Sequence, residues 1–224
     1  MSTIALFDPE QLPVDSIAGE PAIVEERLTV DCMRTRFANQ PLWSVETMNE
    51  KLPGIEYSTP TAASILLPLV LRDTGLSVLL TQRTAHLTHH AGQISFPGGR
   101  AEASDASVIE TALRETEEEV GLHRDHIEVI GQLPDYLTGT GYHITPVVAL
   151  VHPPFELQAD PAEVAEIFEV PLAFLMNGQH HQRRTIEMPN GAGRRTFYAM
   201  PYQRFFIWGA TAGILRNLFH FLRG

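Results

Sequence analysis

Cysteine is almost missing from this chain of 224 residues, because Cys32 is the only one. A single thiol cannot form a disulfide within the chain, and it cannot build a zinc site that needs several thiolates. A chain of this length buries enough surface to fold without either kind of cross-link. We therefore expect a protein that folds around a hydrophobic core in a reducing compartment.

Positive charge is also scarce, with 16 Lys and Arg residues against 27 Asp and Glu residues and a formal net charge of −11. A nucleic-acid-binding protein presents a basic face, so this balance argues against nucleic acid as a partner. An acidic protein repels an anionic substrate unless a bound divalent cation reverses the local charge.

Long apolar stretches are missing as well. Residues 64–71 form an apolar run that is far too short to cross a bilayer. The longer stretch 205–222 is interrupted by Arg216, Asn217 and His220, so it predicts a packed C-terminal helix. The first ten residues have neither the basic start nor the apolar stretch of a signal peptide. We expect a cytoplasmic protein without membrane contact.

The order of apolar stretches and turn residues predicts an α/β fold. Residues 1–60 are expected to form an N-terminal extension, irregular except for a short helix at 23–37, and residues 61–224 the main domain. The expected strands of that domain are 63–71, 76–81, 126–132 and 145–151, and its expected helices are 105–120, 161–168 and 208–222. Strands interleaved with helices predict a mixed central sheet with helices packed against it.

The helix expected at 105–120 has clear boundaries in the sequence. Ser104 or Asp105 can cap its first turn with a side-chain oxygen. Gly121 stands where a left-handed residue commonly ends a helix. Four residues at spacings of four, three and four form one stripe that we expect to face the core: Ile109, Leu113, Thr116 and Val120.

The same helix carries a cluster of carboxylates on its other side. Glu115, Glu118 and Glu119 stand at positions i, i+3 and i+4, which makes them neighbours on the helix surface. Three adjacent carboxylates repel one another in water, and a hard cation such as Mg²⁺ or Mn²⁺ removes that repulsion. The alternative is a solvated acidic surface, in which Arg114 tempers the repulsion because it reaches Glu118 at i+4.

The residues from Arg114 to Leu122 resemble the second half of the Nudix box, which reads Arg-Glu-apolar-any-Glu-Glu-any-Gly-apolar. Every charged and glycine position of that half matches, and Thr116 replaces the usual aliphatic residue. The first half departs more, because Ala106 stands where the box has a glutamate and Asp105 lies one residue earlier. A match at this many fixed positions is a specific signal.

This resemblance implies both a fold and a mechanism. The fold would be the Nudix α/β/α sandwich with a mixed central sheet, in which the helix and the loop before it form the site. Glu115, Glu118 and Glu119 would bind Mg²⁺ or Mn²⁺ together with a carbonyl near Gly99. A carboxylate would take the proton of the attacking water, with Glu118 as the first choice and Glu119 as the rival. Arg114 would orient a glutamate without touching the substrate.

A second resemblance lies directly upstream of the box. Leu79-Leu80-Thr81-Gln82-Arg83 and Gly92-Gln93-Ile94-Ser95-Phe96-Pro97-Gly98-Gly99 are similar to the motif that precedes the box in the coenzyme A pyrophosphatase branch. Thr84 replaces a Ser or Ala of that motif, and Thr88 stands where a second Arg is expected. Three later segments are also similar to this branch: 136–142, 171–175 and 207–212.

The second resemblance implies hydrolysis of the diphosphate in coenzyme A or its thioesters, which gives a phosphopantetheine and adenosine 3′,5′-bisphosphate. Arg83 would hold a phosphate, because a planar guanidinium binds it bidentately. Phe96 and Gly98 would form the turn that approaches the substrate closely, and Tyr136 and Tyr142 would stack on adenine. The expected partner is a small-molecule nucleotide substrate, and a homodimer is left open.

Simpler interpretations stay open for several of these residues. Arg83 at a strand end is as often a surface ion-pair partner as a phosphate ligand, and tyrosines are more often core or rim residues. His86, His89 and His90 raise the question of zinc, but adjacent histidines in a loop usually point apart. His89 or His90 would instead replace the arginine that is missing at Thr88.

Two other functions remain as alternatives. The first is a Nudix pyrophosphatase that acts on ADP-ribose, dinucleotides or nucleoside triphosphates, which the changes at Thr84 and Thr88 keep open. The second is a non-catalytic nucleotide-sensing Nudix protein. The three retained glutamates argue against this second alternative, because sensing relatives often lose them.

Overall fold

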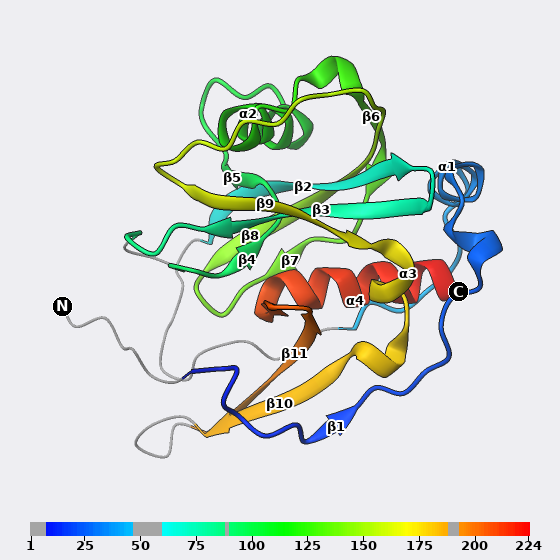
Figure 1. The fold of residues 1–224 in the computed structure, drawn as a ribbon, viewed down its shortest axis with the longest axis vertical. Helices are drawn as coiled ribbons and strands as arrows, with labels where there is room; N and C mark the ends of the chain where they lie inside the picture. Colours follow the sequence, from blue (N-terminus) through cyan, green and yellow to red (C-terminus); the bar gives the residue numbers. More distant parts are fainter. Residues whose placement is uncertain (1–7, 47–59, 88–89, 188–192) are drawn as a thin grey trace.

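The computed structural model describes residues 8–46, 60–87, 90–187 and 193–224. It contains two β-sheets, and Figure 1 shows helix α4 (Gly209–Arg223) lying between them. Helix α2 (Val108–Val120) covers the other face of the larger sheet. The expected α/β fold, with a mixed central sheet and flanking helices, is confirmed, and the second sheet adds a layer that was not expected.

The larger sheet is mixed. Its strands are β2 (Thr61–Arg72), β3 (Gly75–Arg83), β4 (Ile94–Ser95), β5 (Gly98–Arg100), β6 (Ile127–Gln132), β7 (Tyr136–Leu137), β8 (Tyr142–Val151) and β9 (Val164–Pro171). They follow the order β4-β3-β2-β8-β6, with β5 beside β2, β7 beside β8 and β9 beside β3. Only the central pair of β2 and β8 is parallel within this described sheet. The four strands expected for the main domain correspond to β2, β3, β6 and β8.

Strand β2 is buried on both faces, which explains its nearly unbroken apolar sequence. Leu66 packs with Ala112 of α2, whereas Leu67 belongs to the large core on the α4 side. That core includes Ile214 and Leu218 of α4. The alternation follows from the two-residue period of a strand. The sheet therefore separates α2 from α4, and the two helices stabilise opposite faces of it.

Helix α2 begins later than expected. Ser107 caps it, because its Oγ accepts a hydrogen bond from the Glu110 backbone N–H at 3.2 Å. The expected cap at Ser104 or Asp105 is therefore wrong, since both residues lie in the loop before the helix. Gly121 ends the helix in the left-handed region with φ of 67°, as expected. In the predicted stripe, Thr116 and Val120 are fully buried and the other two residues are half-buried.

The short acidic helix expected at 161–168 is wrong. These residues lead into strand β9, which pairs antiparallel with β3. Val164 and Val170 are buried, while Glu166 and Glu169, which alternate to opposite faces of the strand, form ion pairs with Arg204 and Arg72. Long-range pairing with β3 thus decides the structure of this stretch.

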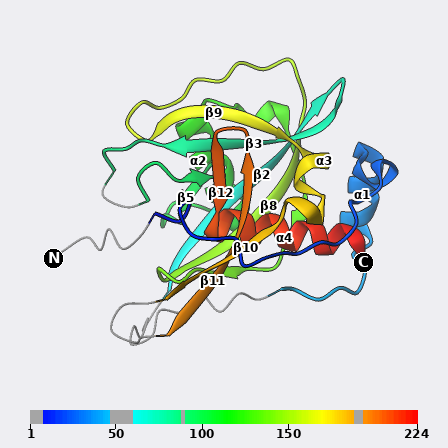
Figure 2. The same cartoon turned by 60° about the horizontal axis from the view of Figure 1, so that its bottom comes forward.

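The second sheet combines one strand from the N-terminal part of the chain with three strands from its C-terminal part. Its strands are β1 (Ser16–Ile17), β10 (Gln182–Glu187), β11 (Arg194–Tyr202) and β12 (Phe205–Trp208), in the order β1-β10-β11-β12. Figure 2 shows the hairpin of β11 and β12 reaching the larger sheet near β9. There the ring of Phe205 stacks on Phe168 with centroids 3.6 Å apart. Between the strands lie the short helices α3 (Leu172–Leu175), η2 (Arg124–His126) and η3 (Gly178–His180).

The described part of the N-terminal extension packs along the rest of the chain. The helix expected at 23–37 is found as a 3-10 turn, η1 (Glu25–Leu28), followed by α1 (Val30–Ala38). Arg36 donates to the Phe221 carbonyl oxygen at the end of α4. Part of the expected extension, residues 47–59, lies outside the described residues. The domain boundary at residue 60 remains a prediction.

None of the helices that the structure describes is both long enough and apolar enough to span a membrane. The C-terminal stretch forms α4, and most of its residues are buried between the two sheets.

Candidate active site

Two of the three predicted glutamates point from α2 towards strand β5. Glu119 has only 4% of its side chain exposed, and its Oε2 accepts a hydrogen bond from Gly98 N at 3.1 Å. Glu115 is 18% exposed and lies against Gly99. Glu118 is 59% exposed. The helix therefore brings Glu115 and Glu119 together at the glycine pair, and it leaves Glu118 towards solvent.

The glycine pair allows this close approach because neither residue has a Cβ. A Cβ at Gly99 would lie 2.4 Å from Glu115 Cδ. A Cβ at Gly98, whose φ is 149°, would lie 2.5 Å from the carbonyl oxygen of Ser64 on β2. The first clash would be with the free end of a side chain and the second with backbone. Gly98 thus permits the pairing of β5 with β2, and Gly99 leaves room for a carboxylate.

Both carboxylates, buried Glu119 and half-buried Glu115, lie where ionisation is unfavourable. Burial raises the pKa of Glu119 to about 7, although the hydrogen bond from Gly98 and the charge of Arg83 oppose this. Burial also raises the pKa of Glu115, despite its hydrogen bond from Arg114. A neighbouring cation favours the ionised form of such groups. These oxygen donors therefore suit a hard divalent cation such as Mg²⁺ or Mn²⁺.

Arg114 connects α2 to the loop before it. Its guanidinium donates to Asp105 at 2.9 and 3.0 Å, and to Glu115 and Glu118 at 3.0 Å each. It also donates to the Arg100 carbonyl oxygen at 3.2 Å. The hydrogen bonds from Arg114 hold the pKa of Asp105 well below its usual range. Arg114 thereby contacts two of the glutamates, while Asp105, whose role the sequence left open, anchors Arg114.

Arg83, at the end of β3, reaches the buried carboxylates from the sheet. Its Nη1 lies 3.4 Å from Glu119 Oε1, and its Nη2 lies 3.5 Å from Glu163 Oε2. Glu163 lines the pocket, and its negative charge contributes to the raised pKa values of Glu115 and Glu119. No local sequence signal identifies Glu163, because only the pairing of β9 with β3 carries it to the box helix.

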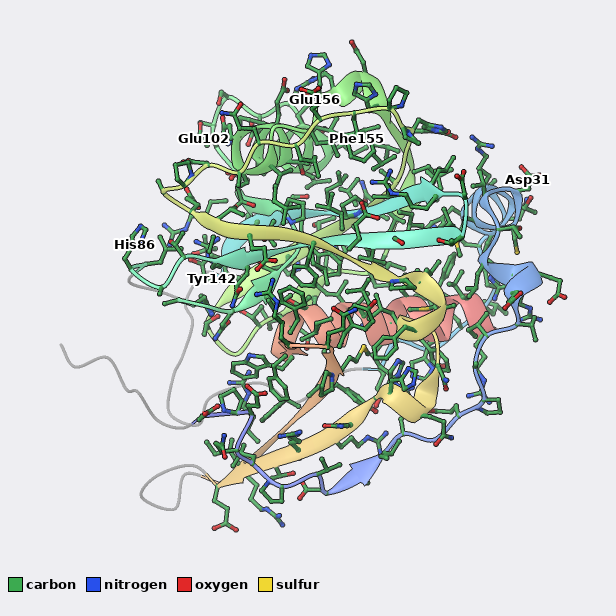
Figure 3. All side chains as sticks on the ribbon, viewed as in Figure 1. Asp31, His86, Glu102, Tyr142, Phe155 and Glu156 are labelled. Atoms are coloured by element: carbon green, nitrogen blue, oxygen red, sulfur yellow. The ribbon has the colours of Figure 1, made fainter. Side chains whose placement is uncertain are left out.

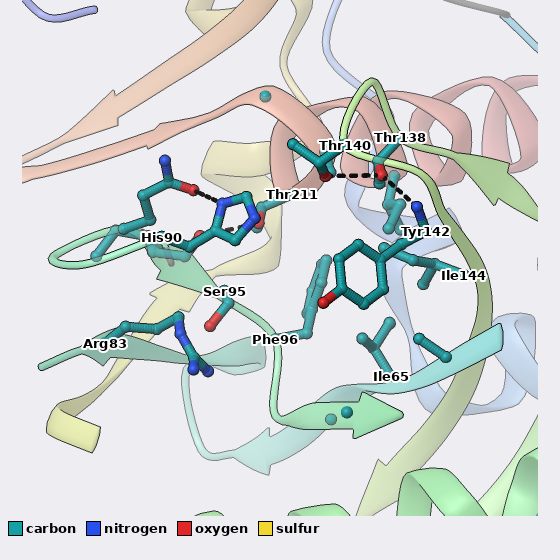
Figure 4. Close-up of a pocket in the computed structure, with 18 of the residues that line it drawn as sticks. Ile65, Arg83, His90, Ser95, Phe96, Thr138, Thr140, Tyr142, Ile144 and Thr211 are labelled. Atoms are coloured by element: carbon teal, nitrogen blue, oxygen red, sulfur yellow. Dashed lines mark hydrogen bonds between the residues drawn. The ribbon is translucent and has the colours of Figure 1, made fainter. Parts of the chain in front are cut away.

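A pocket of about 680 Å³ opens beside these residues (Figure 4). Six of the residues predicted for the site line it: Arg83, Phe96, Gly98, Gly99, Glu115 and Tyr142. The ring of Tyr142 faces Phe96, Ile65 and Ile144, and Arg83 lies further along the same pocket. Trp208, Thr211 and Ile214 of β12 and α4 provide another wall. The pocket thus extends from the carboxylates into the space between the large sheet and α4.

Tyr136, which the resemblance suggested as an adenine contact, is 6% exposed and belongs to the core. It packs against α4 at Gly213, where a Cβ would lie 2.3 Å from the tyrosine hydroxyl. It is not among the residues that line the pocket. Tyr142 therefore lines the pocket, whereas Tyr136 packs in the core and does not line it.

The two described histidines of the loop after β3, His86 and His90, contact different partners. His86 is exposed at the outer edge of the molecule (Figure 3), where its Nε2 lies 3.1 Å from the Ala162 carbonyl oxygen. His90 lines the pocket and contacts Gln93 Oε1 through Nδ1 at 2.8 Å. His89, and Thr88 beside it, lie outside the described residues. Zinc binding by these histidines gains no support.

In the described ranges, no three His, Cys, Asp or Glu side chains are grouped closely enough to hold a metal ion as they stand. Glu119 at Gly98 and Glu115 at Gly99 nevertheless lie at one glycine pair, and Glu163 is near enough to affect the pKa of both. Glu119 is buried, Glu115 is half-buried and Glu163 is exposed, and all three offer the carboxylate oxygens that Mg²⁺ and Mn²⁺ prefer.

Comparisons with known proteins agree with this geometry. The NUDIX domain family model matches residues 60–188. An uncharacterized Nudix hydrolase of Escherichia coli O139:H28 (strain E24377A / ETEC), NudL, is 40% identical over 193 residues, which cover 85% of this chain and 93% of that protein. The chain belongs to the Nudix hydrolase family. A NudL protein of Shigella boydii serotype 18 matches this Nudix hydrolase to the same extent.

Solved structures are similar over about half of this Nudix hydrolase. A Nudix hydrolase from M. smegmatis, RenU, is 24% identical with a TM-score of 0.44, covering 56% of this chain and 78% of its own. A C. elegans Ap4A hydrolase complex is 18% identical with a TM-score of 0.43, covering 49% and 80%. Nudix enzymes generally use divalent metals, and the activity that follows from family membership is hydrolysis of a diphosphate substrate.

Proposed function

We propose that this Nudix hydrolase cleaves the diphosphate of coenzyme A or its thioesters, which gives a phosphopantetheine and adenosine 3′,5′-bisphosphate. One observation carries the proposal. The two halves of the coenzyme A-like motif, separated in sequence, meet at the same carboxylates. Arg83 lies 3.4 Å from Glu119, while Phe96, Gly98 and Gly99 line the pocket beside it.

Glu115 and Glu119, with the carbonyl of Gly99, are the proposed ligands of Mg²⁺ or Mn²⁺, and Glu118 remains a further candidate. A bound divalent cation neutralises the diphosphate and lowers the pKa of a bound water. Arg83 faces Glu119 and Glu163 and is placed to stabilise negative charge on the phosphate oxygens. Arg114 holds Glu115 and Glu118 in orientation through their carboxylates.

The proton acceptor lies among three glutamates. Glu118 was the first choice from the motif, but its carboxylate is largely exposed and contacts Arg114. Glu119 is buried beside Gly98, and Glu163 lines the pocket. A general base must come within hydrogen-bond reach of the proton that it removes. The positions of Glu119 and Glu163 therefore support them over Glu118.

Glutamine substitutions test this assignment. Glu119→Gln is expected to lower turnover by about 10²-fold or more without unfolding the chain, because it removes a metal ligand or base. Glu163→Gln should lower turnover more than Glu118→Gln does. Glu117→Gln is the matched control on the same helix, because Glu117 faces His123 and Arg124. Full activity of Glu119→Gln would remove the proposed site.

The substrate is tested by hydrolysis rates on coenzyme A, acyl-coenzyme A, ADP-ribose, dinucleotides and nucleoside triphosphates with Mg²⁺ and Mn²⁺ in turn. Coenzyme A or its thioesters should give the highest kcat/KM. Thr84, whose departure from the motif left ADP-ribose open, is buried and donates to the Ala162 carbonyl oxygen. Its substitution therefore concerns loop packing more than substrate contact. A clear preference for ADP-ribose would reject the coenzyme A assignment.

A further inference from the structure

Arg100 and Tyr142 form a pair at the edge of the pocket that the sequence did not indicate. Arg100 Nη2 donates to the Tyr142 hydroxyl at 2.7 Å and its Nε donates to the same oxygen at 3.3 Å. The guanidinium also lies over the tyrosine ring, 5.5 Å from its centroid. Three contacts with one aromatic residue hold an otherwise exposed guanidinium in place.

Strand register explains why the pair faces the pocket. Ala63 of β2 stands opposite Arg100 on one side and opposite Ile144 on the other. Residues directly opposite each other in a sheet share a face, and Tyr142 lies two residues before Ile144 on that face. All four residues line the pocket. Arg100 also follows Gly99 directly, so it starts from the strand that meets Glu115.

Arg100 differs from the other two arginines around the glutamates in its partners. Arg83 pairs with Glu119 and Glu163, and the guanidinium of Arg114 contacts three carboxylates. Within the described ranges, Arg100 makes no ion pair, and its bonds to the hydroxyl use two of its five N–H groups. The remaining N–H groups are available to an acceptor in the pocket.

We propose that Arg100, held by Tyr142, binds a non-bridging oxygen of the substrate diphosphate. This inference rests on the proposed function. Arg100 then supplies the second guanidinium that the motif places at position 88, where this chain has Thr88. Arg83 from β3 and Arg100 from β5 both line the pocket, so two guanidinium groups then offset charge on the diphosphate.

The contribution of the Arg100 backbone can be separated from that of its side chain. The Arg100 carbonyl oxygen accepts a hydrogen bond from Arg114 at 3.2 Å, and every substitution at position 100 keeps this oxygen. The side chain is exposed, so its replacement leaves no buried gap. A loss of activity on changing the side chain therefore reports on substrate contact.

The test compares Arg100→Gln, Arg100→Lys and Tyr142→Phe in steady-state kinetics on coenzyme A and on dephospho-coenzyme A. Arg100→Gln should lower kcat/KM about tenfold or more on both substrates, as expected for loss of one charged hydrogen bond. Arg100→Lys should recover part of this loss, because lysine keeps the positive charge but lacks the planar guanidinium that binds phosphate bidentately. Tyr142→Phe should lower kcat/KM less, because it removes only the anchor. Arg124→Gln, which makes the same charge change beside Glu110, should match the wild type.

The outcomes separate the inference from the proposed function. If Arg100→Gln has the same kcat/KM as the wild type on both substrates, the inference is overturned. A loss confined to coenzyme A would also overturn it, because Arg100 would then contact the 3′-phosphate that dephospho-coenzyme A lacks. If the wild type prefers another diphosphate, the coenzyme A assignment fails, and the same variants measured on that diphosphate still decide the role of Arg100. If the wild type cleaves no diphosphate, both proposals are rejected.

Discussion

Gly99→Ala is the most direct perturbation of the proposed metal site, because the new methyl group would occupy the space of the Glu115 carboxylate. An alanine Cβ would lie 2.4 Å from Glu115 Cδ and 2.6 Å from its Oε1. Favourable contact between such atoms begins near 3.5 Å, so the carboxylate must move by about 1 Å. A displacement of that size at a reacting centre lowers turnover by roughly 10²-fold.

The fold should tolerate this change. The clash falls on the free end of a side chain, and the backbone of Gly99 lies outside the left-handed region. Gly98→Ala is the matched variant with the opposite expectation. Its φ is 149°, and its Cβ would lie 2.5 Å from the Ser64 carbonyl oxygen and 2.6 Å from the Ile65 Cα, neither of which can rotate away. We expect it to destabilise the protein by about 2 kcal/mol or more, which lowers Tm by roughly 4–8 °C.

The assay combines thermal unfolding with hydrolysis of coenzyme A over a range of Mg²⁺ concentrations. Gly99→Ala should unfold within about 2 °C of the wild type while it loses turnover and needs more Mg²⁺. Gly98→Ala should show the larger fall in Tm. The reasoning is refuted if Gly99→Ala keeps wild-type turnover and Mg²⁺ dependence, because Glu115 would then have no role at that position.

Three further predictions concern the metal, the pH and the N-terminal segment. Chelation of divalent ions should abolish hydrolysis, and Mg²⁺ should restore it; metal-independent turnover would contradict the mechanism. Burial raises the pKa of Glu119 from 4.5 to about 7, so the folded state binds more protons than the unfolded state in this pH range. The metal-free protein should therefore lose stability on the order of 3 kcal/mol as pH rises from 4.5 through 7. Melting curves at pH 5 and 8 should show a smaller loss for Glu119→Gln, and an equal loss would exclude this cause. Arg216→Ala should lower the free energy of unfolding by about 3 kcal/mol, because it leaves Glu20 and Glu46 without their buried partner; an unchanged denaturant midpoint would rule this out.

The box helix could be predicted because its signals are local. Gly121 ends it in the left-handed region, and the spacing of its glutamates places them near one another. Spacing alone could not decide which of them enters the site. At 3.6 residues per turn, Glu115 and Glu119 lie about 40° apart around the helix, whereas Glu118 lies about 60° to the other side. The position of β5 selects the first two, and that position depends on pairing with β2.

The residues that the sequence could not reveal depend on contacts between distant segments. Glu163 reaches the carboxylates only because β9 pairs with β3, and its acidic neighbours at helical spacing favoured the wrong element. Arg100 and Tyr142 are 42 positions apart and meet through their separate pairings with β2. Tyr136 and Tyr142 look alike in the sequence, yet one is buried against α4 and the other faces the pocket.

The N-terminal segment bears on the site through α4. Arg216 of α4 is 2% exposed, and it pairs with Glu20 and Glu46 from that segment. Burial would raise the pKa of Glu46, but hydrogen bonds from His220, Tyr198 and Arg216 outweigh it and lower that pKa, so strong acidification weakens these contacts. Residues 8–46 therefore help to hold α4 in position, and the first turns of α4 form a wall of the pocket.

The proposed metal site and one wall of the pocket come from different parts of the chain. The carboxylates and the glycine pair lie within the NUDIX domain matched at 60–188, whereas Trp208, Thr211 and Ile214 line the pocket from beyond it. We expect a change in these later residues to alter the shape of the pocket and to leave the positions of Glu115 and Glu119 unchanged. We therefore expect relatives that share only the matched domain to differ from this chain in that wall of the pocket.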